Sequence, residues 1–517
     1  MLKFRSSTIL SNAAVAAATV LYGLAQPANA DVKRVEQAIQ QRRYSDAVAE
    51  LQLLAKHGDA QAQAQASLGT LMMFGYGVPR DDVAALAMFT KLAKINPVLG
   101  DNGLAGFYVL RQPGPEGYAK ALALYRKHAL EGDAAAQYGL GTLYLYGYGV
   151  QADYVQAAHW YQLSSDQYNL CALNALAYLY DNGMGVSRDS AKAVRLYQQA
   201  ADGGLAYAMY NLGLLYESGR NVPADPQRAL VLYQKAAAQG VAYAQTRMGV
   251  IYGEGLGVKA DGAKAYELLR KAADLGDANA YTELGYLTYK GIDGKPDFSA
   301  SMKWYIKAAE AGVSAGEAGI GFLYENGTGV PKDDAKAFEW NKRAAEHGNA
   351  DGQIALGRFY MLGRGTVQDN AAGMRWLLRA AEQGDLKAQA MVGASYLGGK
   401  NVPADYAAGI KWLRMAALAG NARAQFSLGV AYYYGTGVKR DLLRAYTWEA
   451  ISAARGYDYA KQHHTDGEWR LSFDEQVRGN LAAIRWQVGR DLPFAEEPPG
   501  YVGLGVFNLN APFVPGR

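Results

Sequence analysis

The sequence has 517 residues but only one cysteine, Cys171. A single thiol cannot form an internal disulfide, so packing must stabilise the fold. Cysteine pairs at zinc-binding spacing are also missing, and none of the six histidines belongs to a His-Glu-x-x-His motif. We therefore predict no metal and no cofactor, and we expect His463 and His464 to be a solvated pair.

The chain also lacks a strong charge of either sign. It has 52 Lys and Arg residues against 48 Asp and Glu residues, and no run of basic residues. Binding to a phosphate backbone needs a concentrated basic face. Nucleic acid is therefore excluded as a partner.

Residues 1–30 have the pattern of a secretory signal peptide. Lys3 and Arg5 precede an apolar stretch, and Ala28-Asn29-Ala30 is an A-x-A cleavage site. A membrane anchor is the alternative, but polar residues interrupt the stretch and a span needs about 20 apolar residues. We expect a mature chain that begins at Asp31, is periplasmic or secreted, and does not span the membrane.

A period of 36 residues organises residues 62–457. Eleven blocks follow without an insertion, and their first residues, counted below as position 0, are Ala62, Val98, Ala134, Leu170, Ala206, Ala242, Ala278, Ser314, Ala350, Leu386 and Ala422. A fixed period of this size is typical of stacked helical hairpins. The sequence therefore predicts an all-α fold of helix-turn-helix repeats.

The first helix of each repeat is predicted from two positions. Position 6 is always apolar, from Leu68 to Leu428, which indicates an amphipathic helix of about 13 residues. Position 7 is Gly in nine repeats, and Ala105 or Ala177 in the others. Because glycine inside a helix costs about 1 kcal/mol relative to alanine, we expect it to permit a close approach of helices.

Glycines and aspartates punctuate the repeat. Loops such as Gly327-Thr328-Gly329-Val330 predict positive φ angles that end the first helix. Ten repeats then carry an Asp that we predict to cap the second helix, worth about 1 kcal/mol each: Asp81, Asp153, Asp189, Asp225, Asp261, Asp297, Asp333, Asp369, Asp405 and Asp441. The second repeat has Gly117 instead and a different loop, so its local geometry should depart.

Tryptophans recur at position 26 of the second helix. They are Trp160, Trp304, Trp340, Trp376, Trp412 and Trp448. We interpret those from Trp304 onward as a packing ladder.

These motifs together resemble the Sel1-like repeat family, which is related to the tetratricopeptide repeats. The eighth repeat shows the match in Ile320-Gly321, Tyr324, Gly327 to Val330, Asp333, Lys336-Ala337, Trp340 and Arg343-Ala344-Ala345. The resemblance covers residues 62–457 and implies a right-handed α-solenoid of Sel1-like, TPR-like repeats.

Different segments flank the repeats. Residues 31–61 predict an N-terminal capping helix pair, and residues 458–491 predict C-terminal capping helices, as expected for the ends of a solenoid. Residues 492–517 are rich in Pro, Gly and aromatic residues. They predict a tail that is either disordered or extended and docked.

The one match to a catalytic motif lacks the structural context that the motif requires. Gly312-Val313-Ser314-Ala315-Gly316 matches G-x-S-x-G, but that nucleophile motif needs a strand that enters a helix, and here it joins two helices. We therefore predict that the chain is not an enzyme.

Positions 4, 8 and 11 of the first helix form a stripe opposite the leucine side. In helical solenoids the first helix usually lines the concave face, where partners dock. Packing between successive first helices is the alternative. The candidate partner-binding residues are Tyr138, Tyr178, Asp181, Tyr210, Glu217, Tyr286, Tyr289, Phe322, Glu325, Arg358, Phe426 and Tyr433.

The family resemblance also implies a set of possible functions. Exported Sel1-like proteins include scaffolds for exopolysaccharide synthesis and secretion and regulators of the envelope, which implies a periplasmic scaffold that binds envelope proteins. A secreted module that binds glycans, polysaccharide or host factors is the alternative. A β-lactamase-like hydrolase is less favoured, since that branch of the family has paired cysteines in each repeat.

Overall fold

The computed structural model describes residues 34–35, 38–39, 43–56, 61–220, 222–292, 294–399, 402–466 and 469–494. The predicted signal peptide, much of the predicted N-terminal cap and the tail from residue 495 lie outside these residues. Every regular element of the described residues is a helix, apart from an isolated bridge between Ile292 and Lys295. The predicted all-α solenoid of helix-turn-helix repeats is confirmed.

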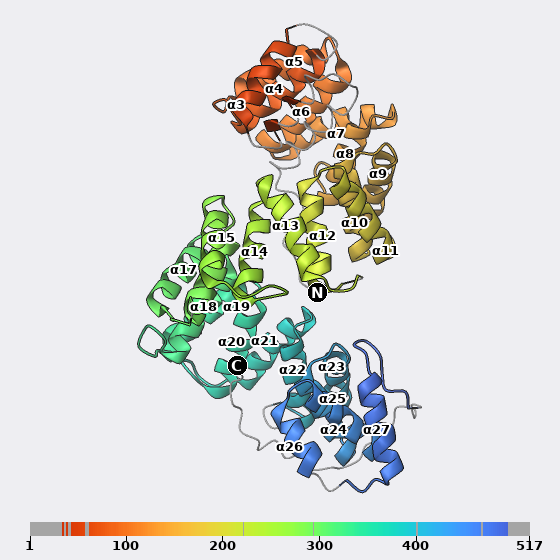
Figure 1. Ribbon diagram of the computed structural model, residues 1–517, viewed down its shortest axis with the longest axis vertical. Coiled ribbons are helices and arrows are strands. Elements are labelled where there is room, and N and C mark those ends of the chain that lie inside the picture. The colour runs from red at the N-terminus through yellow and green to blue at the C-terminus, as the bar shows by residue number, and fades with distance from the viewer. Residues whose placement is uncertain are drawn as a thin grey trace. The chain divides into compact units, whose positions relative to one another are not determined.

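Each repeat begins with one helix, and these first helices alternate with second helices in chain order (Figure 1). The first helices are α4 (Gln61–Phe74), α6 (Pro97–Arg111), α8 (Ala134–Tyr146), α10 (Leu170–Asn182), α12 (Ala206–Ser218), α14 (Ala242–Glu254), α16 (Asn279–Lys290), α18 (Ser314–Asn326), α20 (Ala350–Leu362), α22 (Leu386–Gly398) and α24 (Ala422–Tyr434). Most have 13 residues, as position 6 predicts.

The second helices pack back against the first. They are α5 (Asp82–Ala93), α7 (Pro115–Leu130), α9 (Tyr154–Asp166), α11 (Ser190–Asp202), α13 (Pro226–Ala238), α15 (Gly262–Asp274), α17 (Phe298–Glu310), α19 (Asp334–Glu346), α21 (Asn370–Glu382), α23 (Tyr406–Leu418) and α25 (Leu442–Ala454). Before them lies α3 (Tyr44–Leu54), and after them α26 (Asp458–Asp466) and α27 (Phe473–Arg485).

The chain divides into two compact units between Glu283 and Leu284, within α16. In each unit a helix packs mainly on its neighbours along the chain. None of the described helices combines the length and the apolar composition that a membrane span requires.

The core of each repeat forms around position 6, whose side chain is buried in all eleven repeats. Position 7 explains how closely the two helices approach. A Cβ atom added to Gly141 would lie 2.8 Å from the ring of Tyr161, and one added to Gly357 would lie 2.9 Å from Leu377. The glycines at position 7 thus make room for the side chain at position 27 of the second helix, as the sequence predicts.

The predicted helix ends and caps are also confirmed. Gly327 ends α18 with a φ of 67°, and all ten predicted aspartates accept a hydrogen bond from a backbone N–H in the first turn of the second helix. The second repeat departs, as expected. There α7 begins after Gly114, which has a φ of 136° and provides no side-chain cap.

The tryptophans form a packing ladder only in part. Trp304 and Trp448 are buried, but Trp340, Trp376 and Trp412 are partly exposed. The guanidinium carbon of Arg343 lies 4.4 Å from the ring centroid of Trp340, and that of Arg379 lies 4.4 Å from Trp376. The tryptophans at position 26 are therefore buried in some repeats and partly exposed in others, with an arginine beside Trp340 and Trp376.

Candidate interaction surface

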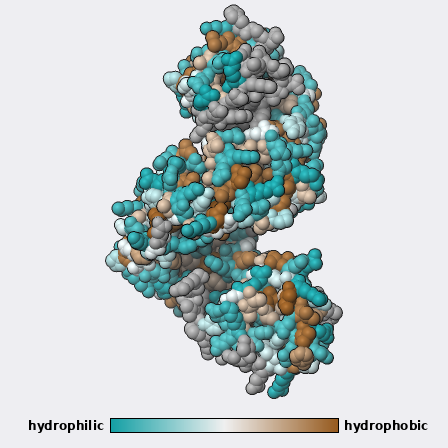
Figure 2. All heavy atoms as spheres, in the orientation of Figure 1, coloured by the Kyte–Doolittle hydropathy of each residue, from teal (hydrophilic) through white to brown (hydrophobic). Residues whose placement is uncertain are grey.

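Hydrophilic residues cover most of the face shown in Figure 2, with hydrophobic residues in small groups between them. Such a surface does not reveal a docking site through hydropathy alone. Whether a candidate residue can contact a partner therefore depends on its own burial and contacts.

Three of the twelve are buried. Tyr138 is 2% exposed and its ring lies 5.6 Å from that of Tyr161, while Tyr210 packs 5.8 Å from Tyr233. Asp181 is buried in an ion pair with Arg220, and burial raises the pKa of its carboxyl. In this conformation these three residues do not form part of a surface that a partner touches.

Glu217 belongs to a polar network that joins two repeats. Its carboxylate accepts a hydrogen bond from the Tyr233 hydroxyl at 2.7 Å and another from Nε of Arg247 at 3.1 Å. Arg247 comes from α14 and Glu217 from α12, so the network ties neighbouring first helices together. Tyr178, by contrast, is half-buried and forms no such bridge in the described residues.

One aromatic residue of α16 and one of α18 are the most accessible of the twelve. Tyr286 and Phe322 are each 43% exposed, and both occupy position 8. Tyr289 is half-buried and contacts the ring of Phe322 edge-on at 5.4 Å. Phe322 is therefore held by an aromatic neighbour while much of its own surface stays open.

Charged groups lie beside this aromatic surface. Glu325 Oε1 accepts hydrogen bonds from Arg358 at 2.8 Å and from Arg364 at 2.9 Å. Arg364 also forms a bidentate pair with Asp334, at 3.1 and 2.7 Å. Two carboxylates thus balance two guanidiniums, and the network connects α18, α19 and α20.

Phe426 and Tyr433 face the C-terminal cap. The ring of Phe426 lies 5.8 Å from His463, and the ring of Tyr433 lies 5.6 Å from Trp469. They are held in an aromatic cluster that joins α24 to the segment after α25.

The two histidines that we expected to be a solvated pair are each partly exposed, but each also has a partner in the structure. His463 Nδ1 lies 2.7 Å from the carboxylate of Glu449, which is fully buried, and His464 packs 4.3 Å from the ring of Tyr446. Position 27, where Glu449 lies, carries Tyr, Phe or Leu in most repeats. A buried acid there creates a need for a cationic partner, which α26 supplies.

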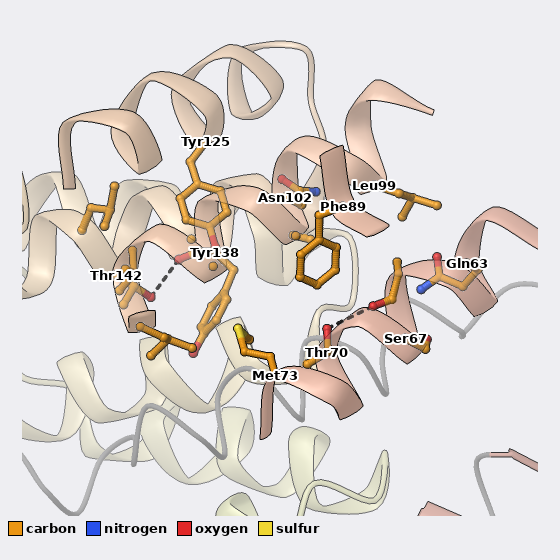
Figure 3. A pocket seen from close by; sticks show the side chains of 18 of the residues that line it. Gln63, Ser67, Thr70, Met73, Phe89, Leu99, Asn102, Tyr125, Tyr138 and Thr142 are labelled. Atoms are coloured by element: carbon orange, nitrogen blue, oxygen red, sulfur yellow. Dashed lines mark hydrogen bonds between the residues drawn. The ribbon is translucent and has the colours of Figure 1, made fainter. Parts of the chain in front are cut away.

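A groove on α4, α6 and α8 contains only one of the predicted residues, Tyr138. In Figure 3 the side chains of Met73, Phe89, Tyr125 and Tyr138 converge on it from α4, α5, α7 and α8. Its volume is about 130 Å³. Several groove residues lie at positions 4, 8 and 11 of the first three repeats, but small side chains such as Ala66, Thr70 and Gly106 do not by themselves indicate a binding site.

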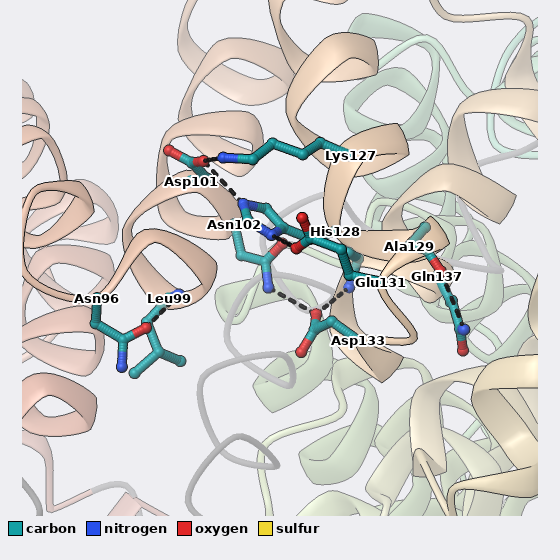
Figure 4. Close-up of polar contacts among 11 residues, drawn as sticks. Asn96, Leu99, Asp101, Asn102, Lys127, His128, Ala129, Glu131, Asp133 and Gln137 are labelled. Atoms are coloured by element: carbon teal, nitrogen blue, oxygen red, sulfur yellow. Dashed lines mark hydrogen bonds and ion pairs between the residues drawn. The ribbon is translucent and has the colours of Figure 1, made fainter.

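Sequence reasoning also missed a buried histidine on α7 (Figure 4). His128 Nε2 lies 2.8 Å from Asp101, and Nδ1 lies 2.6 Å from Glu131. Lys127 also approaches Asp101, at 3.2 Å. The cluster fastens α7 to α6 in the repeat that lacks the usual aspartate cap, so it has a structural role.

No group of three or more His, Cys, Asp or Glu side chains suited to a metal ion occurs in the described part of the chain. Cys171 is buried, and burial raises the pKa of its thiol to about 12. Ser314 of the G-x-S-x-G sequence is the first residue of α18 and follows a turn from α17. It therefore lacks the strand that this motif requires.

The Sel1 repeat matches ten segments of the chain: 62–96, 134–169, 172–205, 206–241, 242–277, 278–313, 314–349, 350–385, 386–421 and 422–457. The chain is similar to a protective antigen of uropathogenic Escherichia coli strains that displays an SLR fold. The two are 30% identical over 84% of this chain and 93% of the antigen, with a TM-score of 0.43. It is also similar to a Sel1 repeat protein from Oxalobacter formigenes, with 31% identity over 47% of this chain and 96% of that protein and a TM-score of 0.41. No curated protein matches the sequence. Because the matched segments make up more than half of its length, the chain belongs to the Sel1 repeat family.

Proposed function

We propose that this protein is a non-catalytic periplasmic scaffold that binds proteins of the cell envelope through the first-helix surface of α16, α18 and α20. Sel1 repeats mediate protein interactions. The observation that carries the proposal is the pair of aromatic side chains, Tyr286 and Phe322, at the same repeat position and each 43% exposed.

The chemistry of this surface suits a protein partner. Aromatic and Arg side chains are the most frequent anchors of protein interfaces. Phe322 is supported by Tyr289, so little conformational freedom is lost when a partner covers it. Arg358 and Arg364 already have carboxylate partners, so binding does not have to bury an uncompensated charge.

The location and the pathway belong to the proposal as well. The predicted signal peptide supports export, and the family resemblance supports a role in exopolysaccharide synthesis and secretion or in envelope regulation. In such a role the repeats hold proteins of the machinery together, while the chemistry belongs to those proteins.

Affinity capture from envelope extracts tests this function. The mature chain, its Tyr286→Ala/Phe322→Ala variant and a Val367→Ala control are compared as baits, since Val367 is 85% exposed and lies in the loop before α21. We expect the mature chain and the control to retain the same envelope proteins and the double variant to lose them. Equal capture by all three baits, or no specific protein, contradicts the proposal.

Glycan binding is the second candidate, because the exposed ring of Tyr286 offers a flat apolar face to a sugar. Lys290 lies 5.4 Å from the centroid of that ring and would sit beside the ligand. Titration with envelope polysaccharides while tyrosine fluorescence is followed separates the two functions. A change that Tyr286→Ala abolishes supports the glycan, and an unchanged signal supports the protein partner.

A further inference from the structure

The groove on α4, α6 and α8 is built by the same positions of three successive repeats. Positions 1, 4, 5, 8 and 11 supply Gln63, Ala66, Ser67, Thr70 and Met73 in the first repeat, and Leu99, Asn102, Gly103, Gly106 and Val109 in the second. The third repeat contributes Ala135, Tyr138, Gly139 and Thr142. None of the described residues that line the groove carries a charge.

Three polar side-chain atoms of the lining residues lack hydrogen-bond partners in the described structure. They are the Ser67 hydroxyl, the side-chain oxygen of Asn102 and the Tyr138 hydroxyl, and all three atoms are buried. A buried polar group without a partner destabilises the protein, because it has lost its hydrogen bonds to water. The groove therefore suits an occupant that combines apolar side chains with hydrogen-bonding groups, which is the composition of a peptide segment.

The size of the groove limits the occupant. A cavity of about 150 Å³ holds one benzene molecule, and this groove has a volume of about 130 Å³. Gly106 marks its open part, because a Cβ atom added there would meet only the hydroxyl of Tyr125, at 3.6 Å. One aromatic ring is enough to fill this space.

The sequence contains a segment with these properties. From Pro498 to Gly516 the chain has no charged residue, and Tyr501, Phe507 and Phe513 recur along it. Its charge matches that of the groove, since an uncharged lining penalises any charged side chain that enters it. Residues 6–30 are also uncharged but are expected to be removed on export, and the uncharged residues 61–79 and 134–152 belong to repeats that form the groove.

We propose that the groove on α4, α6 and α8 binds the aromatic segment between Pro498 and Gly516 of a second copy of this chain. The groove belongs to the first three repeats, and the segment follows the last one, so each copy has one donor and one acceptor. Such a head-to-tail contact is heterologous and links copies into rings or filaments. The inference does not depend on the envelope partner proposed above, which contacts other repeats.

Filling the groove tests the contact. Position 8 carries Tyr286 and Phe322 in other repeats, so Gly106→Phe is compatible with the helix. Ala394 occupies position 8 of the tenth repeat and is partly exposed, which makes Ala394→Phe the matched control. We expect Gly106→Phe and Phe507→Asp/Phe513→Asp to weaken self-association of the full mature chain by about tenfold or more in sedimentation experiments, and Ala394→Phe to leave it unchanged.

Photo-crosslinking identifies the occupant. p-Benzoylphenylalanine replaces Gln63, a partly exposed residue of the groove lining, in the full mature chain, so that the space beside Gly106 stays open. ¹⁵N-labelled and unlabelled copies are mixed before irradiation. We expect mixed-label crosslinks to the tryptic peptide Asp491–Arg517. Crosslinks only within one copy, crosslinks to another protein or to another segment, or no crosslink overturn the proposal, and so does equal weakening by the Ala394→Phe control.

Discussion

Arg358 of α20 donates a hydrogen bond from Nη2 to Oε1 of Glu325, on α18, at 2.8 Å. Both residues belong to the stripe of positions 4, 8 and 11, and they lie 33 residues apart in the sequence. The stripe is therefore held in shape by contacts between neighbouring repeats. The exposed Phe322 lies one turn before Glu325 on the same helix.

Removing the shared carboxylate should loosen α18 and α20. Glu325→Ala deletes the acceptor that Arg358 and Arg364 have in common, and we expect a loss of about 1–3 kcal/mol in the opening free energy of both helices. Hydrogen exchange of the α18 and α20 peptides measures this loss. Arg358→Met, which keeps much of the apolar stem, should cost less, and equal protection in all three proteins would argue against a structural role for the pair.

Two mid-helix glycines in the same unit should respond to alanine with opposite signs. A Cβ atom at Gly141 would lie 2.8 Å from the fully buried ring of Tyr161, so Gly141→Ala should destabilise by about 1–3 kcal/mol despite its better helix propensity. At Gly106 the nearest atom would be 3.6 Å away, so Gly106→Ala should stabilise by up to about 1 kcal/mol. Thermal unfolding of both variants checks the prediction, and a shift of the same sign in both refutes it.

The aspartate caps should stabilise the second helices because their side-chain oxygen accepts hydrogen bonds, and not because of their charge. Asp153 accepts hydrogen bonds from the backbone N–H groups of Val155 and Gln156, at 2.9 and 3.0 Å. Asp153→Ala should destabilise α9 by about 1 kcal/mol, whereas Asp153→Asn should retain most of the stability because its oxygen still accepts. The two variants are compared by hydrogen exchange at the start of α9. Similar losses in both would show that the charge, rather than the cap, is what counts.

The contact between α25 and α26 should weaken as the pH rises. The hydrogen bond to Glu449 raises the pKa of His463, and burial raises the pKa of Glu449. The stabilisation by protonated His463 is complete below about pH 6.5, the ordinary histidine value, and is lost as the pH passes through the raised pKa. Burial lowers the pKa of the adjacent His464, so its contribution has the opposite sign and is lost as the pH falls.

A histidine substitution separates these two contributions. The protection of α26 against hydrogen exchange, corrected for intrinsic rates, should exceed that of a His463→Gln variant at about pH 5.5, and the difference should shrink toward pH 8. His159→Gln, at an exposed position, is the control and should behave as the unmodified chain. A difference independent of pH would exclude His463 as the titrating group.

The fold could be predicted from the sequence because the same local signals for helices, turns and caps recur every 36 residues. Position 6, the Gly loops and the aspartate caps each report a nearby interaction within one hairpin, and all three were confirmed. Glu449 shows where this reading fails. A helical wheel places it at a core position, but its partner, His463, comes from the helix beyond the last repeat.

Exposure along the stripe could be predicted less well. The wheel gives the same side of the helix to Tyr210 at position 4 and Phe322 at position 8. Tyr210 is nevertheless covered, by Tyr233 of its own repeat and Tyr243 of the next one, whereas Phe322 stays open. The burial of a side chain on the stripe depends on the side chains of the adjoining helices. It cannot be predicted from the sequence of one helix alone. The contact of His128 with Asp101 was missed for the same reason.

Site-specific photo-crosslinking in living cells is the most direct test of partner binding by the first-helix surface. p-Benzoylphenylalanine replaces Phe322 in one variant and Val367 in another, and irradiation precedes purification under denaturing conditions. Binding through α16, α18 and α20 predicts a discrete envelope protein attached at position 322 and none at position 367. A bare chain at position 322, or the same adducts at both positions, would contradict it.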